Sequence, residues 1–189
     1  MKIEDGKGKN GDASVSSVQR LNVSAKIGPR MFYISRDDGL TFDAISIGDN
    51  DYAVGEYCFY IKNTSATRNM FLQHLEFHST DACRLIIDEV TGTAAGGTVI
   101  VPSNLNLGSG LLAEATSMGG GGAITGLTKV KQIGTHRNAA LADSEMNYQG
   151  ALILSPNKAI AIEYDAEYGG TTGIIEIDAF FWYENLGAS

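Results

Sequence analysis

Two histidines four residues apart, His74 and His78, flank a carboxylate, Glu76, in the stretch FLQHLEFH. In a zinc-protease helix, two histidines at this spacing share one face, and a glutamate directly after the first histidine is the general base. Here the glutamate comes one residue too late for that motif. The stretch also has a period of two, which predicts a strand. In a strand the histidines would lie ~13 Å apart, too far for one metal ion to bind both. We predict polar-face strand histidines and no metal site.

The remaining candidates for chemistry fail on spacing. The acidic turns GDND and RDDG lack the ligand spacing of a calcium loop, and the glycine runs GTAAGG and GGGG lack the Lys-Ser/Thr of a phosphate loop. Cys58 and Cys83 lie in apolar stretches, where a thiol pKa is raised and the nucleophilic thiolate is scarce. We expect two buried free thiols there and leave a disulfide between them open. The sequence therefore predicts a protein that is not an enzyme and uses no cofactor.

Charge and hydropathy limit the class of partner. The chain has 189 residues, enough for one domain with a sizeable core, and a formal net charge of −8. Its basic residues are scattered, whereas a nucleic-acid footprint needs them clustered. No stretch approaches the ~20 apolar residues that span a membrane, and the N-terminal residues lack the apolar core of a secretory signal. We expect no nucleic acid and no membrane as partner, and synthesis in a cytoplasm.

Residues 1–30 differ in composition from the rest of the chain. They are small and polar, and after Ile3 their large apolar residues within the first 25 positions are few: Val15, Val18, Leu21 and Val23. Such a segment cannot close a core of its own. We predict an extended arm over residues 1–30 that orders against the rest of the domain or against a neighbouring subunit, followed by a β domain over residues 31–189.

From Met31 onward the apolar period is two, and short strands alternate with turns. This pattern favours an all-β, antiparallel β-sandwich. We expect strands in MFYIS, LTFDAISIG, YCFYIKN, FLQHLEFHS, CRLIIDEV, TVIV, KVKQIG, ALILS, AIAIEYDAE and GIIEIDAFFWYE. Residues 91–97 and 108–126, the latter centred on Gly119 to Gly122, are expected to be loops because a glycine run loses much backbone entropy when ordered. Residues 139–148 permit a helix.

The last predicted strand, residues 173–184, is apolar on one face and half apolar on the other, where Phe180 and Trp182 lie. Two interpretations remain open: a loop of the same chain covers the second face, or these aromatics pack against another subunit, as large aromatics favour interfaces. The candidate interface residues are therefore Phe180 and Trp182 together with the apolar arm residues Val15, Val18, Leu21 and Val23. A sugar-stacking platform is a further alternative, built from the tyrosines Tyr52, Tyr57, Tyr60, Tyr164 and Tyr168.

Three stretches together resemble small β-sandwich structural proteins of tailed phages. They are EYCFYIKNTSATRNMFLQHLEFHST, VTGTAAGGTVIVPSNLNLGSG and KAIAIEYDAEYGGTTGIIEIDAFFWYE, which cover about half of the chain. The resemblance lies in strand and turn residues, and it carries over no catalytic residue. The tetraglycine and the long polar arm depart from the pattern.

This resemblance implies a jelly-roll-like virion component. The first expectation is a capsid decoration (cement) protein, commonly trimeric, that binds the outside of a phage head and stabilises it. A related head or tail accessory protein would share the pattern. The alternative is a carbohydrate- or receptor-binding module of a tail or fibre, with a depolymerase as a third and less favoured class. For a decoration protein, the expected location is the capsid surface of the virion, after synthesis in the host cytoplasm.

Overall fold

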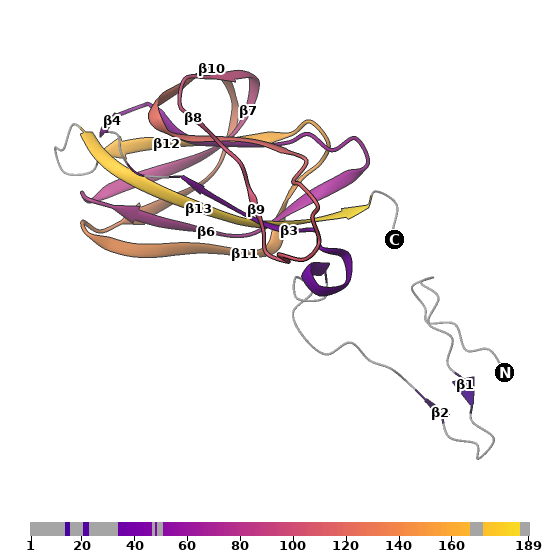
Figure 1. Ribbon diagram of the computed structural model, residues 1–189. Helices are drawn as coiled ribbons and strands as arrows, with labels where there is room; N and C mark the ends of the chain where they lie inside the picture. The colour runs from indigo at the N-terminus through magenta and orange to yellow at the C-terminus, as the bar shows by residue number, and fades with distance from the viewer. Residues whose placement is uncertain are drawn as a thin grey trace.

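Two large antiparallel sheets form the main body of the computed structural model, which describes residues 14–15, 21–22, 34–46, 48, 51–166 and 172–185 (Figure 1). Sheet I has the order β11-β6-β13-β3-β9, with β4 also paired to β13, and sheet II joins β5, β12, β7, β10 and β8. The strands of sheet I are β3 (Thr41–Ser46), β4 (Asp51–Ala53), β6 (Arg68–Ser79), β9 (Ser103–Asn104), β11 (Ala142–Leu154) and β13 (Thr172–Asn185). Those of sheet II are β5 (Tyr57–Asn63), β7 (Cys83–Ala95), β8 (Thr98–Ile100), β10 (Ala115–Asn138) and β12 (Ala159–Ala166). The predicted all-β class is confirmed.

The main core lies between the two sheets, as in a β-sandwich. Its inward faces follow the predicted period of two: on β13, Ile175, Ile177 and Ala179 are buried, whereas Glu176 is exposed. Aromatic rings from sheet I meet in this core, with the Phe42 and Phe181 centroids 5.7 Å apart. Each large side chain buried in this way contributes about 1.5–3 kcal/mol. The core, rather than any helix, holds the fold together.

Strand β10 crosses from one edge of sheet II to the other. Its first part pairs with β5, from Ala115 to Gly119 and again at Ile124, and its second part pairs with β7 from Thr125 onward. The crossing occurs at the tetraglycine, which was predicted to be a loop. That prediction is wrong: the run is a bulge inside a strand, and Gly120, Gly121 and Gly122 have φ of +64°, +67° and +130°. Glycine adopts such angles without the steric cost of a side chain.

The crossing strand closes a second, smaller core on the other face of sheet II (Figure 1). Ala159 and Ala161 of β12 turn to this side, while their neighbours Ile160 and Ile162 turn to the main core. Asp88 is also buried here. Its Oδ2 accepts a hydrogen bond from Tyr57 Oη at 3.3 Å and pairs with Lys129 Nζ at 2.8 Å. This contact links three strands of sheet II, β5, β7 and β10.

Three further expectations differ from the structure. Residues 139–148 were predicted to permit a helix, but they form a turn followed by the start of β11, because the edge of β6 offers a strand partner there. Residues 91–97 were predicted to be a loop, but β7 extends to Ala95 by pairing with β10, and only Gly96 and Gly97 form the turn. Ile34 and Ser35, the end of the predicted strand MFYIS, belong to a single π-helical turn, η1 (Ile34–Asp38).

The arm is described at four residues only. β1 (Ser14–Val15) and β2 (Leu21–Asn22) pair with each other and form a two-stranded sheet separate from sheets I and II. Val15 and Leu21 are register partners in this pairing, whereas Val18 and Val23 lie outside the described residues. Across the described ranges, no helix has the length and apolar character needed to cross a membrane.

Candidate functional site

The two histidines lie on strand β6, as predicted. Each has its own carboxylate: His74 Nε2 lies 3.2 Å from Glu76, and His78 Nδ1 lies 2.7 Å from Asp143 on β11. The His74 ring also packs on Phe180, with centroids 4.2 Å apart. Within the described parts of the chain, no group of three or more histidine, cysteine, aspartate or glutamate side chains is placed to hold a metal ion.

Acidic side chains gather on the outer face of sheet I around these histidines. A shallow depression of about 400 Å³ is lined by Glu76, His78, Asp143, Glu176 and Asp178, with Phe77 beside them. Burial, together with the negative charges of Glu176 and Glu76, raises the pKa of Asp178 to about 6. This face therefore repels further negative charge.

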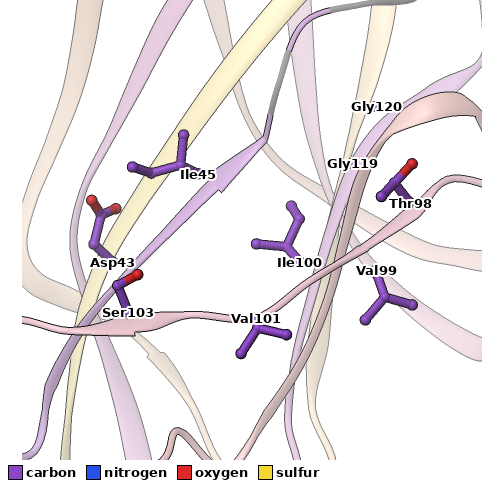
Figure 2. A pocket seen from close by; sticks show the side chains of 9 residues that line it. All are labelled: Asp43, Ile45, Thr98, Val99, Ile100, Val101, Ser103, Gly119 and Gly120. Atoms are coloured by element: carbon purple, nitrogen blue, oxygen red, sulfur yellow. The ribbon is translucent and has the colours of Figure 1, made fainter.

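A groove of about 480 Å³ opens between β3 of sheet I and β8 of sheet II (Figure 2). The segment 98–103 forms one wall: it leaves sheet II through β8 and joins sheet I through β9, where Ser103 pairs with Asp43. Ile45 and Ile100 add apolar surface, and Gly119 and Gly120 of β10 close the far end. The groove exists because this one segment bridges both sheets at their edges.

Asp43 lies in this groove and is the residue that makes it chemically distinct. It is 8% exposed, and its Oδ1 has no hydrogen-bond partner among the described residues. Burial raises the Asp43 pKa to about 6, and the nearby charges of Asp178 and Glu76 act in the same direction. At neutral pH the carboxyl group is still mostly ionised. The groove thus presents a negative charge between apolar walls.

An exposed apolar strip continues from the groove along the connection between β8 and β10. We define it by six side chains that all lie in residues 99–112, which are Val99, Val101, Leu105, Leu107, Leu111 and Leu112. Half of the large apolar side chains that are exposed in the described residues belong to it, and Leu107 is 95% exposed. Exposed apolar side chains that are concentrated in one segment make it a candidate interaction site.

Two asparagines fix the conformation of this strip. Asn104 Nδ2 donates hydrogen bonds to the carbonyl oxygens of Gly39 (2.8 Å) and Leu111 (3.0 Å), and Asn106 Nδ2 donates to Ser35 O (2.9 Å). The Asn106 amide in turn donates to Asn104 Oδ1 at 2.8 Å. The two asparagine side chains hydrogen-bond to backbone carbonyl oxygens on the inner side of this segment. The leucines between and after the asparagines are left exposed to solvent. The strip is an ordered surface held against η1.

The predicted interface aromatics have different environments. Trp182 is 3% exposed: it stacks on Phe71 with centroids 5.5 Å apart, and the backbone of Gly150 on β11 lies directly over its ring. This corresponds to the first of the two interpretations, coverage by the same chain. Phe180 is half-buried against His74 and keeps part of its ring accessible.

The tyrosines do not form a sugar-stacking platform. Tyr52, Tyr60 and Tyr164 are buried, and Tyr57 is half-buried with its hydroxyl bonded to Asp88. Tyr168 lies outside the described residues.

Both cysteines are buried free thiols, as expected. Burial raises the pKa of the Cys58 thiol well above its ordinary value, which suppresses the reactive thiolate.

Sequence reasoning missed both Asp43 and the strip. Asp43 occupies one of the outward positions of LTFDAISIG, and nothing local indicates that the distant segment around Ser103 pairs beside it and leaves it buried. The strip did leave a signal: apolar residues recur at short intervals through VPSNLNLGSGLL, a segment otherwise rich in turn residues. Leucines repeated in a turn-rich segment are a sign of exposed apolar surface. No protein-family model matches the chain, and a search of curated proteins finds none similar to it.

Proposed function

We propose that this protein is a non-enzymatic structural component of a virion, a capsid decoration (cement) protein that binds the outer surface of a phage head. The observation that carries the proposal is the apolar strip, because its leucines are exposed although hydrogen bonds hold their backbone in place. Leaving such surface in water is unfavourable unless a partner covers it.

The resemblance to tailed-phage β-sandwich proteins supplies the identity of the partner. Most of the strip falls within the second of the three resembling stretches, which ends at Gly110. In the proposed arrangement the domain has a jelly-roll-like topology, the arm of residues 1–30 is extended, and the protein forms a homotrimer on the capsid surface. Several copies of a modest apolar contact then act together, and multivalency raises the overall affinity far above that of one contact.

Co-sedimentation with capsids that lack the protein tests this proposal. We expect the wild-type chain to pellet with these capsids. Because Leu107 and Leu112 together expose the largest apolar area of the strip, the double variant Leu107→Ser/Leu112→Ser should bind at least about tenfold more weakly, a loss of roughly 1.4 kcal/mol or more.

A matched control separates the strip from general surface hydrophobicity. Val130→Ser/Ile133→Ser removes two exposed apolar side chains from β10, outside the strip, and should leave capsid binding unchanged. If the wild-type chain stays in the supernatant, or if both double variants bind as the wild type does, the decoration role is refuted.

A further inference from the structure

The groove between β3 and β8 is suited to a positively charged occupant. Asp43 is buried, with one carboxylate oxygen unpartnered among the described residues, and it shares the lining of the groove with the apolar side chains of Ile45, Val99 and Val101. A long basic side chain matches this combination, since its methylene stem covers apolar surface while its charged head donates to the carboxylate. Within the described residues, β8 also ends sheet II, so its outer edge offers backbone groups to an extended segment.

The N-terminal segment of the chain has the complementary charge. Residues 1–33 contain six basic and three acidic residues, a net charge of +3, whereas the rest of the chain has eight basic and nineteen acidic residues, a net charge of −11. Arg20 stands between Val18 and Leu21, so a guanidinium is flanked on both sides by apolar side chains. The arm sequence thus combines a positive charge with apolar side chains, and the groove combines a negative charge with apolar side chains.

The location of the arm favours a second copy as its acceptor. The described body begins at Ile34, and the next residue, Ser35, is bonded to Asn106 of the strip, so the arm joins the body next to the groove and the strip. In the single chain, however, β1 and β2 pair with each other and with neither β3 nor β8. A two-stranded hairpin is marginally stable alone, and thirty-three extended residues span up to about 110 Å. The arm can therefore reach another molecule and gain stability there.

We propose that the groove of one copy binds the N-terminal arm of a second copy, with Arg20 of the arm paired to Asp43. This inference deepens the proposed function by naming the subunit–subunit contact, and it rests on that function only for its biological setting. Its test uses no capsid, so either idea can fail while the other stands.

Cross-linking between two variants that each carry one added cysteine tests the exchange directly. Full-length protein with Val18→Cys is mixed with full-length protein with Val99→Cys, and a short bismaleimide is added; the native cysteines are buried and do not react in the folded protein. We expect a covalent heterodimer on a denaturing gel. In a Val99→Cys partner that also carries Asp43→Asn, the cross-linking yield at limiting concentration should fall on the order of tenfold, the effect of losing one charge-assisted hydrogen bond.

The controls distinguish arm exchange from nonspecific cross-linking and from cross-linking within one chain, and they test the ion pair separately. Val54→Cys places a thiol of similar exposure on the turn between β4 and β5 and should give no heterodimer with Val18→Cys. Exchange is overturned by the absence of a heterodimer, by equal yields with Val54→Cys, or by a cross-link that forms only within a chain carrying both cysteines. An undiminished yield with Asp43→Asn overturns the ion pair. A thermal melt of that variant, expected to be at least as stable as the wild type, excludes unfolding as the cause.

Discussion

At the scale of single residues, the environment of Asp43 combines two opposing effects. Its carboxyl group is buried and lies near other carboxylates, so ionisation destabilises the folded chain. Yet the same ionised group is what a basic partner would recognise. A residue that lowers the stability of the isolated chain while serving a contact is typical of functional positions.

This position should make stability depend on pH in a defined direction. The folded-state pKa of Asp43 is about 6 and the ordinary value is 3.8, so the folded chain binds the proton more tightly than the unfolded chain between these values. The stabilisation from the protonated form is complete below about pH 4 and is lost as the pH rises through 6. Asp43→Asn should therefore raise the free energy of unfolding by roughly 2–3 kcal/mol at pH 7 and by almost nothing at pH 4.

Urea unfolding at the two pH values measures this difference. Asp51→Asn, which removes an exposed carboxylate at the start of β4, is the control and should change stability little at either pH. An Asp43→Asn variant that is no more stable than the wild type at pH 7 would contradict the assigned cause, the burial of an unpaired charge.

At the scale of elements, sequence patterns predicted most strands because their signals are local. The first part of β13 alternates between buried and more exposed residues as predicted, whereas β5 is buried on both faces from Cys58 to Ile61. β10 could not be predicted, since its path over the tetraglycine depends on pairing with both β5 and β7, which lie far away in sequence. The groove was missed for the same reason: it exists only where segment 98–103 joins the two sheets. The strip leucines were visible, but their exposure depends on Asn104 and Asn106 bonding to η1 and the residue that follows it.

The crossing of β10 should be sensitive to a single methyl group. In Gly121→Ala the new Cβ would collide with Thr98 Oγ1 on β8, in addition to the strain of alanine at a φ of +67°. We expect a loss of roughly 2–4 kcal/mol in the free energy of unfolding, measured by urea denaturation.

The matched control for this variant is Gly110→Ala. Gly110 has nearly the same φ, +65°, and no atom lies within 4 Å of the place that an alanine methyl would take, so this variant isolates the backbone strain. It should lose only about 1–2 kcal/mol. Equal losses for the two variants would show that the β8–β10 approach is not as close as the structure indicates.

At the scale of the whole molecule, charge is divided between residues 1–33 and the rest of the chain. A basic segment of +3 attached to an acidic body of −11 favours contacts in which the arm of one molecule meets the body of another. Because the acidic parts of two molecules repel each other, they would not associate without a basic segment between them. An exchange of N-terminal segments would supply the attraction that offsets this repulsion.

Association between copies should therefore weaken with salt. Raising the ionic strength from about 0.01 M to about 1 M shortens the screening length from about 30 Å to about 3 Å. We expect the cross-linking yield between the Val18→Cys and Val99→Cys variants to fall severalfold over this range. A yield that rises with salt would indicate that apolar contact alone, without charge, brings the copies together.

The central position of β13 in sheet I also governs when the protein can fold during its synthesis. β13 lies between β6 and β3, and it is the last of the described strands to leave the ribosome. Until it emerges, β3 and β6 have no common partner, and the ring of Phe42 lacks Phe181 and Tyr183, which pack on it. The nascent chain must keep these unfinished strand edges from pairing with other chains until Asn185 has left the ribosome, because this sheet is completed only then.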